Sequence, residues 1–388
     1  MKPQEAHTKM AGNGNGKSPV LVVVQLSGGN DFMNTVIPYT NPVYYDSRPL
    51  VGIPQDEVLP FNDTLAFHPM MAPFKELYDA GNVAIVQGIG YPDSSRSHFR
   101  GMDILHTCTP DKVSTVGWLG RTIRELEPEG ENPLTAVNFG IGLPRAMAMP
   151  GVPVTSVNNL DTYGLMSGIE AQEQRDEALQ IFKDMYGPAT GTGPVMEYLA
   201  QTGTDVLTGA DMIKVAPEQY ESSIEYGPSA IAKSLRDVAR VHVADLGTRV
   251  FYTSQGGFDV HANENPDQPR LLGDLSAAVN DFFADLREHD ASDNVAMLVF
   301  TEFGRRINDN GSGTDHGSGG GAFIIGDRVA GGLYAEYPSL ERSQWLHDED
   351  MRHTIDFRGI YGTMLEQWLG VDSKEIVGGE FEQIHPFE

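Results

Sequence analysis

The sequence predicts an α/β protein built on a mostly parallel sheet. Two observations lead to this fold class. Apolar runs of the length of a buried strand recur along the 388 residues, and segments with helical patterning lie between them. This alternation is typical of parallel sheets, in which a helix connects one strand to the next. The four clearest strands are Val20–Leu26, Asn82–Gln87, Thr248–Thr253 and Val295–Phe300.

The composition excludes several functional classes. The formal net charge is -27, from 54 acidic and 27 basic residues, so the overall field does not favour nucleic acid. The acidity is best explained by solubility or by adaptation to salt, and a surface that attracts cations is the alternative. Cys108 is the only cysteine, which excludes an intrachain disulfide and a cysteine-based zinc site. No apolar run approaches 18 residues, so we expect no transmembrane segment.

Residues 1–18 are polar and rich in glycine and asparagine, which predicts a disordered lead-in. They contain neither an apolar signal core nor a twin arginine, so a cytoplasmic location is the default expectation. A start site placed downstream of a lost leader would give the same pattern.

The first strand runs into a glycine turn and a polar cluster, Ser27 to Thr35. Glycines here allow the backbone to approach a ligand closely. Asp31 is expected at the carboxyl edge of the strand, and Asn34 is a candidate for binding substrate. The alternative is an ordinary Asn/Asp turn or helix cap.

The second strand is preceded by an expected helix near residues 70–80 and is followed by a serine-rich loop. Ser94, Ser97 and His98 lie in this loop, before a helix expected over Met102–His106. A serine at a strand-to-helix junction is surrounded by backbone N–H groups, which favour an anionic ligand or an activated nucleophile. Either serine is equally explained as a helix N-cap.

The middle of the chain is expected to be mainly helical. A helix opens over residues 114–122, and a strand is expected over Leu134–Phe139. Amphipathic helices over 168–187, 194–215 and 228–245 are expected to cover the sheet, and part of about 165–245 is a candidate cap.

The third strand is followed by a double glycine and then by Asp259 and His261. A carboxylate and an imidazole at this spacing are suitable ligands for zinc or another transition-metal ion. The alternative is a hydrogen-bonded pair that stabilises the loop.

A helix over residues 271–288 leads to the fourth strand, which is followed by Glu302 and then by Arg305 and Arg306. A Gly- and Asn-rich loop brings the chain to Asp315 and His316. Arg305 or Arg306 is expected to hold an anionic substrate in a bidentate way, as is Arg96. Structural ion pairs are the alternative for all three. A strand over 322–326 and a C-terminal helix within 353–370 follow.

Polar groups therefore follow all four strands, and the carboxyl ends of parallel strands meet at one edge, where ligands bind in such sheets. Carboxylates, imidazoles and a serine, without cysteine ligands, indicate a hydrolytic site with one or two metal ions. Unrelated polar loop residues are the alternative.

Several motifs together resemble the DUF1501 family, which is placed in the alkaline phosphatase/sulfatase superfamily. The resemblance extends from Val20 to Gly370 and is carried by LSGGNDFMNTVIPY, GYPDSSRSHFRGMDILHT, GWLGR, GGFDVH, TEFGRR…GTDHG and DFRGIYGTMLEQWLG. It implies a three-layer α/β/α sandwich, an alkaline phosphatase-like single domain over 19–388, and often a two-metal site. Relatives often carry export leaders, which makes a periplasmic location the alternative to a cytoplasmic one.

The resemblance also implies roles for single residues. Ser97 is the expected nucleophile, and Ser94 is its rival because His98 follows it by four positions. Asp31 and Glu302 would bind the metal ion beside the nucleophile. Asp259, His261 and His316 would bind the second ion, with Asp315 as a partner of His316.

Two departures from the superfamily pattern weaken this assignment. Phe303 follows Glu302 where a histidine ligand is expected, and Asp259 and His261 are separated by one residue where several members have three.

The sequence thus predicts a metal-dependent hydrolase of phosphate or sulfate esters with a serine nucleophile. The expected cofactor is one or two divalent ions per chain, zinc, calcium, magnesium or manganese. The expected substrate is a small anionic ester or a sulfated or phosphorylated glycan. The alternative is a non-catalytic anion- or glycan-binding protein with a degenerate metal site. A carboxylic-ester hydrolase is less favoured, because no G-x-S-x-G motif surrounds a serine at a strand-to-helix turn.

Overall fold

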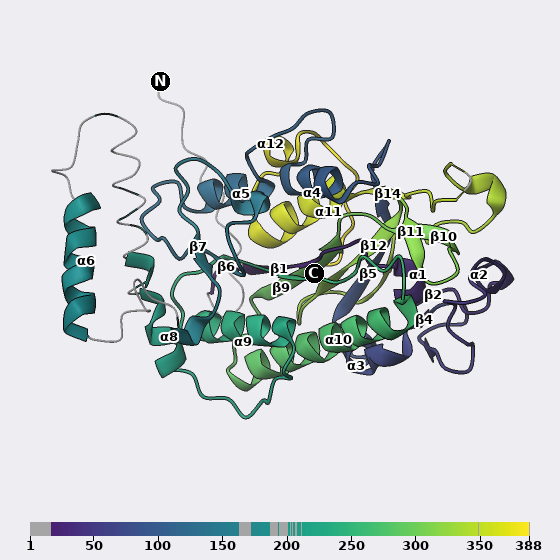
Figure 1. The fold of residues 1–388 in the computed structure, drawn as a ribbon, viewed down its shortest axis with the longest axis horizontal. Coiled ribbons are helices and arrows are strands. Elements are labelled where there is room, and N and C mark those ends of the chain that lie inside the picture. Colours follow the sequence, from purple (N-terminus) through teal and green to yellow (C-terminus); the bar gives the residue numbers. More distant parts are fainter. Residues whose placement is uncertain are drawn as a thin grey trace, which may run out of the picture.

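The fold is a central sheet covered by helices on both faces, as the computed structural model shows (Figure 1). The structure describes residues 17–162, 172–186, 193, 201, 203, 205, 208–210, 212–347 and 349–387. The expected lead-in, apart from residues 17 and 18, lies outside these residues, as does much of the expected cap and of the helix over 194–215. The three-layer α/β/α arrangement is confirmed, and the single-domain boundary stays a prediction.

The main sheet has nine strands in the order β13-β5-β12-β9-β1-β8-β6-β7, with β14 paired to β5. Strand β1 lies in its centre, between β8 and β9, and both neighbours run parallel to it. The strands are β1 (Val20–Leu26), β5 (Val83–Gly90), β6 (Ala136–Phe139), β7 (Thr155–Val157), β8 (Val250–Gln255), β9 (Val295–Thr301), β12 (Gly320–Ile325), β13 (Gly332–Tyr334) and β14 (Ile355–Asp356).

One strand departs from the parallel pattern. Strand β12 is antiparallel to both β9 and β5. It follows β9 through a short antiparallel excursion, β10 (Arg305–Asp309) and β11 (Thr314–His316), without a helical crossover. A connection of this kind returns the chain in the opposite direction. The expectation of a mostly parallel sheet is confirmed.

Both faces of the sheet are buried. Val20, Val22 and Val24 pack into one hydrophobic cluster, whereas Leu21 and Val23 pack into the other. This alternation follows from the two-residue period of a strand. The apolar run of β1 therefore supplies both cores at once.

Different helices cover the two faces (Figure 1). The first face carries α3 (Ala72–Asp79), α9 (Ala230–Val243) and α10 (Glu264–Glu288). The second carries α4 (His98–Thr107), α5 (Trp118–Leu126), α11 (Phe357–Thr363), the π-helical turn Met364–Leu369 and α12 (Lys374–Val377). The other described elements are α1 (Phe32–Thr35), β2 (Val36–Ile37), α2 (Pro42–Ser47), β3 (Leu59–Pro60), β4 (Ala66–Phe67), α6 (Gln172–Tyr186) and α8 (Val215–Glu218), together with short 3-10 turns at Pro69–Met71, Arg145–Met147, Leu160–Thr162 and Arg342–Gln344.

Two helices begin earlier than the sequence predicts. Helix α10 starts at Glu264, because Pro266 lies in its first turn, where the missing N–H has no intrahelical partner to lose. Helix α4 starts at His98 rather than Met102, and this places His98 at a helix N-terminus. Among the described residues, no helix has both the length and the apolar character needed to cross a membrane.

Candidate metal centre

Four polar side chains converge where β5, β8 and β9 end. We call His98, Asp259, His261 and His316 the histidine cluster. His98 opens α4, Asp259 and His261 follow β8, and His316 ends β11. His316 Nε2 lies 3.0 Å from one Asp259 carboxylate oxygen, and His261 Nε2 lies 3.1 Å from the same oxygen. His98 Nε2 lies 3.3 Å from the other oxygen.

The far nitrogen of each histidine has its own acceptor. Nδ1 of His98 lies 2.8 Å from Glu302 Oε1, and Nδ1 of His261 lies 2.9 Å from Asp315 Oδ1. Nδ1 of His316 lies 2.7 Å from the carbonyl oxygen of Arg96. Carboxylates and carbonyls only accept hydrogen bonds, so when these rings are neutral the proton belongs on Nδ1 and the lone pair on Nε2.

The inward-facing atoms of the cluster are consequently all acceptors. The Nε2 atoms of His261 and His316 lie only 2.8 Å apart, and His98 Nε2 is buried without a hydrogen-bond partner. Facing lone pairs repel unless a cation lies between them. The ligand atoms of His98, Asp259 and His316 all lie within 4.8 Å of one another. Imidazole and carboxylate ligands of this kind fit zinc or a similar transition-metal ion, and the outer acceptors orient them.

The protonation states suit metal binding. Burial opposes ionisation of Asp259, but its contacts with His316 Nε2 and with the Arg305 guanidinium outweigh burial and lower the pKa of Asp259 to about 2. Burial lowers the pKa of His316 below its ordinary value, despite the hydrogen bonds that favour its charged form. The hydrogen bond from His261 lowers the pKa of Asp315. Near neutral pH, Asp259 is therefore charged and His316 is neutral.

Glu302 supports the histidine cluster through its contact with His98. It is buried, and its Oε1 atom accepts a hydrogen bond from the Gly28 N–H at 2.9 Å as well as contacting His98. Gly28 has a φ of +123°, and a Cβ there would lie 2.3 Å from the Asp259 nitrogen. Only glycine allows the loop after β1 to approach both Glu302 and Asp259.

Phe303 occupies the place where a histidine ligand was expected. Its ring centre lies 4.9 Å from that of His98 and 4.8 Å from that of His316. It packs against both rings and fixes their planes without offering a ligand atom.

Arg305 holds the loops of the site together. Its side chain is fully buried and donates to the backbone carbonyls of Gly28, Gly29, Phe258 and Thr314 and to Asp259 Oδ1. These contacts use its donors inside the protein. Arg305 therefore holds Asp259 in place, and we do not include it among the proposed substrate-binding residues.

The other two arginine candidates form ion pairs around the site. Arg96 binds Asp350 with an Nη2–Oδ2 distance of 2.7 Å, and Arg306 binds Glu349 at 2.5 Å. Arg306 also lies 3.7 Å from Asp315. The backbone of Arg96, through its carbonyl contact with His316, contributes more to the site than its guanidinium.

Asp31 and Asn34 belong to a second group, which we call the buried carboxylate cluster: Asp31, Asn34, Arg48 and Glu264. Asp31 is fully buried and forms an ion pair with both terminal nitrogens of Arg48. Asn34 donates to Glu264 Oε1 at 2.8 Å. Burial, followed by the charge of Asp31, raises the pKa of Glu264 well above its ordinary value. The positive charge beside Asp31 is thus that of Arg48, and we do not include Asp31 among the proposed metal ligands.

Neither serine candidate lines the cavity that His98, Asp259 and Glu302 border. Ser97 is the N-cap residue of α4, is exposed, and its side chain makes no capping hydrogen bond. Ser94 borders a separate pocket of about 20 Å³ beside Glu302 and Phe303. Each lies within four residues of His98, yet within the described residues neither joins the histidine cluster.

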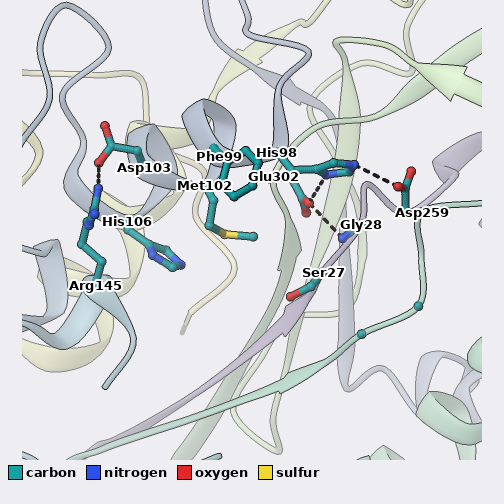
Figure 2. Close-up of a pocket in the computed structure, with 12 residues that line it drawn as sticks. Ser27, Gly28, His98, Phe99, Met102, Asp103, His106, Arg145, Asp259 and Glu302 are labelled. Carbon is teal, nitrogen blue, oxygen red and sulfur yellow. Dashed lines mark hydrogen bonds and ion pairs between the residues drawn. The ribbon is translucent and has the colours of Figure 1, made fainter. Parts of the chain in front are cut away.

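A cavity of about 640 Å³ opens from the histidine cluster along α4 (Figure 2). His98, Asp259 and Glu302 lie at one end, and Asp103 and Arg145 lie at the other. Apart from His98, Asp259 and Glu302, none of the residues that line it was a candidate from the sequence. These residues are Ser27, Gly28, Phe99, Met102, Asp103, His106, Arg145, Gly256 and Gly257. A signal was available for α4, because residues 98, 102 and 106 share one helical face.

A protein-family model described as "Protein of unknown function (DUF1501)" matches residues 87–378. The chain belongs to the DUF1501 family. The matched DUF1501 region contains all four residues of the histidine cluster and excludes Asp31. A comparison with curated proteins gives no match.

Solved structures similar to this DUF1501 chain include three from bacteria. A Vibrio parahaemolyticus protein in the alkaline phosphatase superfamily has 11% identity and a TM-score of 0.39, over 96% of this chain and 71% of that one. The PsFucS1 sulfatase from Pseudoalteromonas sp. has 12% identity and a TM-score of 0.41, over 95% and 71%. The alkaline phosphatase from the Antarctic bacterium TAB5 has 11% identity and a TM-score of 0.36, over 82% and 95%.

Proposed function

We propose that this protein is a metal-dependent hydrolase of phosphate or sulfate esters. The observation that carries the proposal is the set of inward-facing acceptors in the histidine cluster, which borders the cavity through His98 and Asp259. An acceptor-only cluster beside an open cavity is suited to a cation that also contacts a ligand.

His98, Asp259 and His316 would hold the ion, and His261 would complete the set through its contacts with Asp259 and His316. A bound divalent ion supplies Lewis-acid activation of water and of the ester oxygen. Glu302 and the Arg96 carbonyl keep the histidine protons at Nδ1, so Nε2 stays available as a ligand.

We assign the attack to water rather than to Ser97, because Ser97 and Ser94 lie outside the cavity lining. In this reaction the water oxygen bonds to phosphorus or sulfur, the bond from that atom to the ester oxygen breaks, and the alcohol leaves with a proton. No oxidant or reductant is required.

A non-catalytic anion- or glycan-binding protein is the second candidate. It is favoured by Phe303, which packs between His98 and His316 where a further ligand was expected. It is also favoured by Arg48, whose guanidinium supplies beside Asp31 the positive charge that a second metal ion would have brought.

The test uses purified protein loaded with zinc or manganese, and compares it with Asp259→Asn. We expect about one ion per chain and turnover of 4-nitrophenyl phosphate or 4-nitrophenyl sulfate. Asp259→Asn should weaken metal affinity by at least about 100-fold, because even residues that only orient a ligand contribute about 10- to 100-fold. His385→Gln, an exposed histidine far along the chain, is the matched control and should behave like wild type.

Metal binding without turnover of either ester class would refute the hydrolase and favour the binding protein. Failure of the protein to bind any divalent ion, or unchanged affinity in Asp259→Asn, would refute the metal centre itself.

A further inference from the structure

The cavity has two unlike walls. One wall is a face of α4, formed by His98, Met102 and His106 at four-residue spacing, together with Phe99 and Asp103. The loop after β8 contributes Gly256 and Gly257 to the lining, and we call this part of the lining the glycine wall. These two glycines follow β8 and precede Phe258 and Asp259. The cavity is therefore a slot lined by side chains of α4 and by main chain of the loop after β8.

The middle of the slot is apolar. Phe99 is 92% exposed, which is unusual for a phenylalanine, and Met102 lies between it and the far end (Figure 2). An exposed aromatic residue beside a cavity commonly marks a ligand-binding surface. A Cβ added at Gly256 would meet no atom within 4 Å, so there is free space beside this residue of the lining. A flat ring fits such a space.

The far end of the slot carries a local positive charge. Arg145 and Arg100 both form ion pairs with the single carboxylate of Asp103. Two guanidinium groups on one carboxylate leave one positive charge uncompensated in this group. Arg100 also donates hydrogen bonds to the backbone carbonyls of Thr109, Pro110 and Lys112. Arg145, in contrast, lines the cavity.

His106 adds a neutral polar group at the same end. Its Nε2 atom contacts Gln25 Oε1 at 2.8 Å and the Tyr252 hydroxyl at 3.2 Å. Burial, followed by the charge of Arg145, lowers the pKa of His106 to about 4. A neutral imidazole beside Arg145 leaves the guanidinium as the charge that a ligand would meet there.

We propose that the substrate is an ester of a ring-bearing alcohol that carries a second anionic group. The inference rests on the proposed hydrolase function. The phosphate or sulfate ester lies at His98 and Asp259, the ring lies between Met102 and the glycine wall, and the second anion binds Arg145. Because the net charge of the protein is -27, a local cation of this kind favours binding of a substrate with a second anionic group.

The first experiment compares two phosphate esters with matched leaving groups, 3-(carboxymethyl)phenyl phosphate and 3-(carbamoylmethyl)phenyl phosphate. The methylene group insulates the ring, so the two phenols have similar leaving ability. We expect kcat/KM to favour the carboxylate by about 10- to 100-fold, as for a hydrogen bond to a charged group. If the enzyme accepts sulfates only, the corresponding sulfate pair is used.

Arg145→Gln should reduce this preference to near unity. Arg270→Gln removes the same charge from an exposed position on α10 and should leave the preference intact. A preference that is absent in wild type, or that survives in Arg145→Gln, overturns the assignment of the second anion.

A second variant tests the slot itself. Gly256→Leu places a side chain in the free space and should lower kcat/KM for both aryl esters by at least about 10-fold relative to methyl phosphate. Gly227→Leu, at another glycine with open space around it and outside the cavity lining, is the control. Equal activity of Gly256→Leu on aryl and methyl esters would overturn the ring site.

Binding separates failure of this inference from failure of the hydrolase. If neither ester is turned over, the hydrolase is refuted, and calorimetry of the same two esters with the metal-loaded protein then decides the inference. Tighter binding of the carboxylate that depends on Arg145 would sustain the site for a ring dianion. Equal binding of the two esters would refute it as well.

Discussion

Asp31 and Asp259 follow neighbouring parallel strands of the same sheet, yet their surroundings are opposite. Asp31 is fully buried against Arg48, and the chain itself supplies its counter-charge. The side chain of Asp259 is 48% exposed and faces three imidazoles that offer lone pairs. A carboxylate at a strand end thus becomes a support or a candidate ligand, depending on whether a cation of the chain reaches it.

The same contrast separates the two clusters as wholes. In the buried carboxylate cluster, Glu264 accepts from Asn34 and Thr314, and Arg48 also donates to the Ile307 and Arg306 carbonyls. In the histidine cluster, His98 Nε2 has no hydrogen-bond partner. Closed polar networks rigidify a core, whereas open ones are suited to binding. Three substitutions test this difference, in decreasing order of expected effect.

Arg48→Met should produce the largest change. It removes one partner of a fully buried ion pair and leaves Asp31 without its counter-charge, which destabilises proteins by about 3–5 kcal/mol. Urea unfolding measures the loss. Lys75→Met, which breaks the partly exposed pair with Asp79, is the control and should cost less than about 1 kcal/mol. Similar unfolding midpoints for the two variants would show that the buried ion pair of Arg48 and Asp31 has no special stabilising role.

Glu302→Gln should have an intermediate effect on the other cluster. It removes the charge that holds the proton on His98 Nδ1, so metal affinity should fall by about 10- to 100-fold. Competition with a fluorescent zinc chelator measures the affinity, and nitrogen-15 NMR of the histidine rings reports the tautomer. Glu380→Gln, at an exposed site, should change neither. A wild-type affinity together with an altered His98 tautomer would show that His98 is not a ligand.

Glu264→Gln should have the smallest effect at pH 5, where the folded protein keeps the carboxyl proton, and its effect appears only as the pH rises. The folded-state pKa of Glu264 is raised by burial and by Asp31, so the folded protein keeps a proton that the unfolded chain releases above about pH 4.5. This contribution is complete below that pH and is lost as pH rises toward the raised pKa. The loss is on the order of 1 kcal/mol per pH unit at most.

The amide of Glu264→Gln is neutral at every pH, so its melting temperature should decline less than that of wild type between pH 5 and 9. Differential scanning calorimetry across this range provides the comparison. Parallel curves for the two proteins would mean that Glu264 is ionised in the folded state.

The sequence predicts the parallel sheet well because its strands are long apolar runs with helices between them. It also indicates which loops meet, since Asp259, His261 and His316 follow β8 and β9. It does not predict Arg48, which reaches Asp31 from an irregular segment without periodicity. Nor does the sequence predict that Arg305 is buried while Arg306 is partly exposed. In strand β10 the side chain of Arg305 points inward and that of Arg306 points outward. The sequence pattern of this segment is typical of a loop, so it does not predict the alternation.

The central position of β1 has a consequence for the synthesis of the protein. Its only neighbours in the sheet are β8 and β9, which begin at Val250 and Val295. At about 5–20 residues per second, the ribosome needs roughly 10–45 s after β1 emerges to complete the first of these partners. For that time the apolar strand VLVVVQL is unpaired. The nascent chain therefore depends on slow closure of long-range contacts, and β1 is the segment that a chaperone would have to shield.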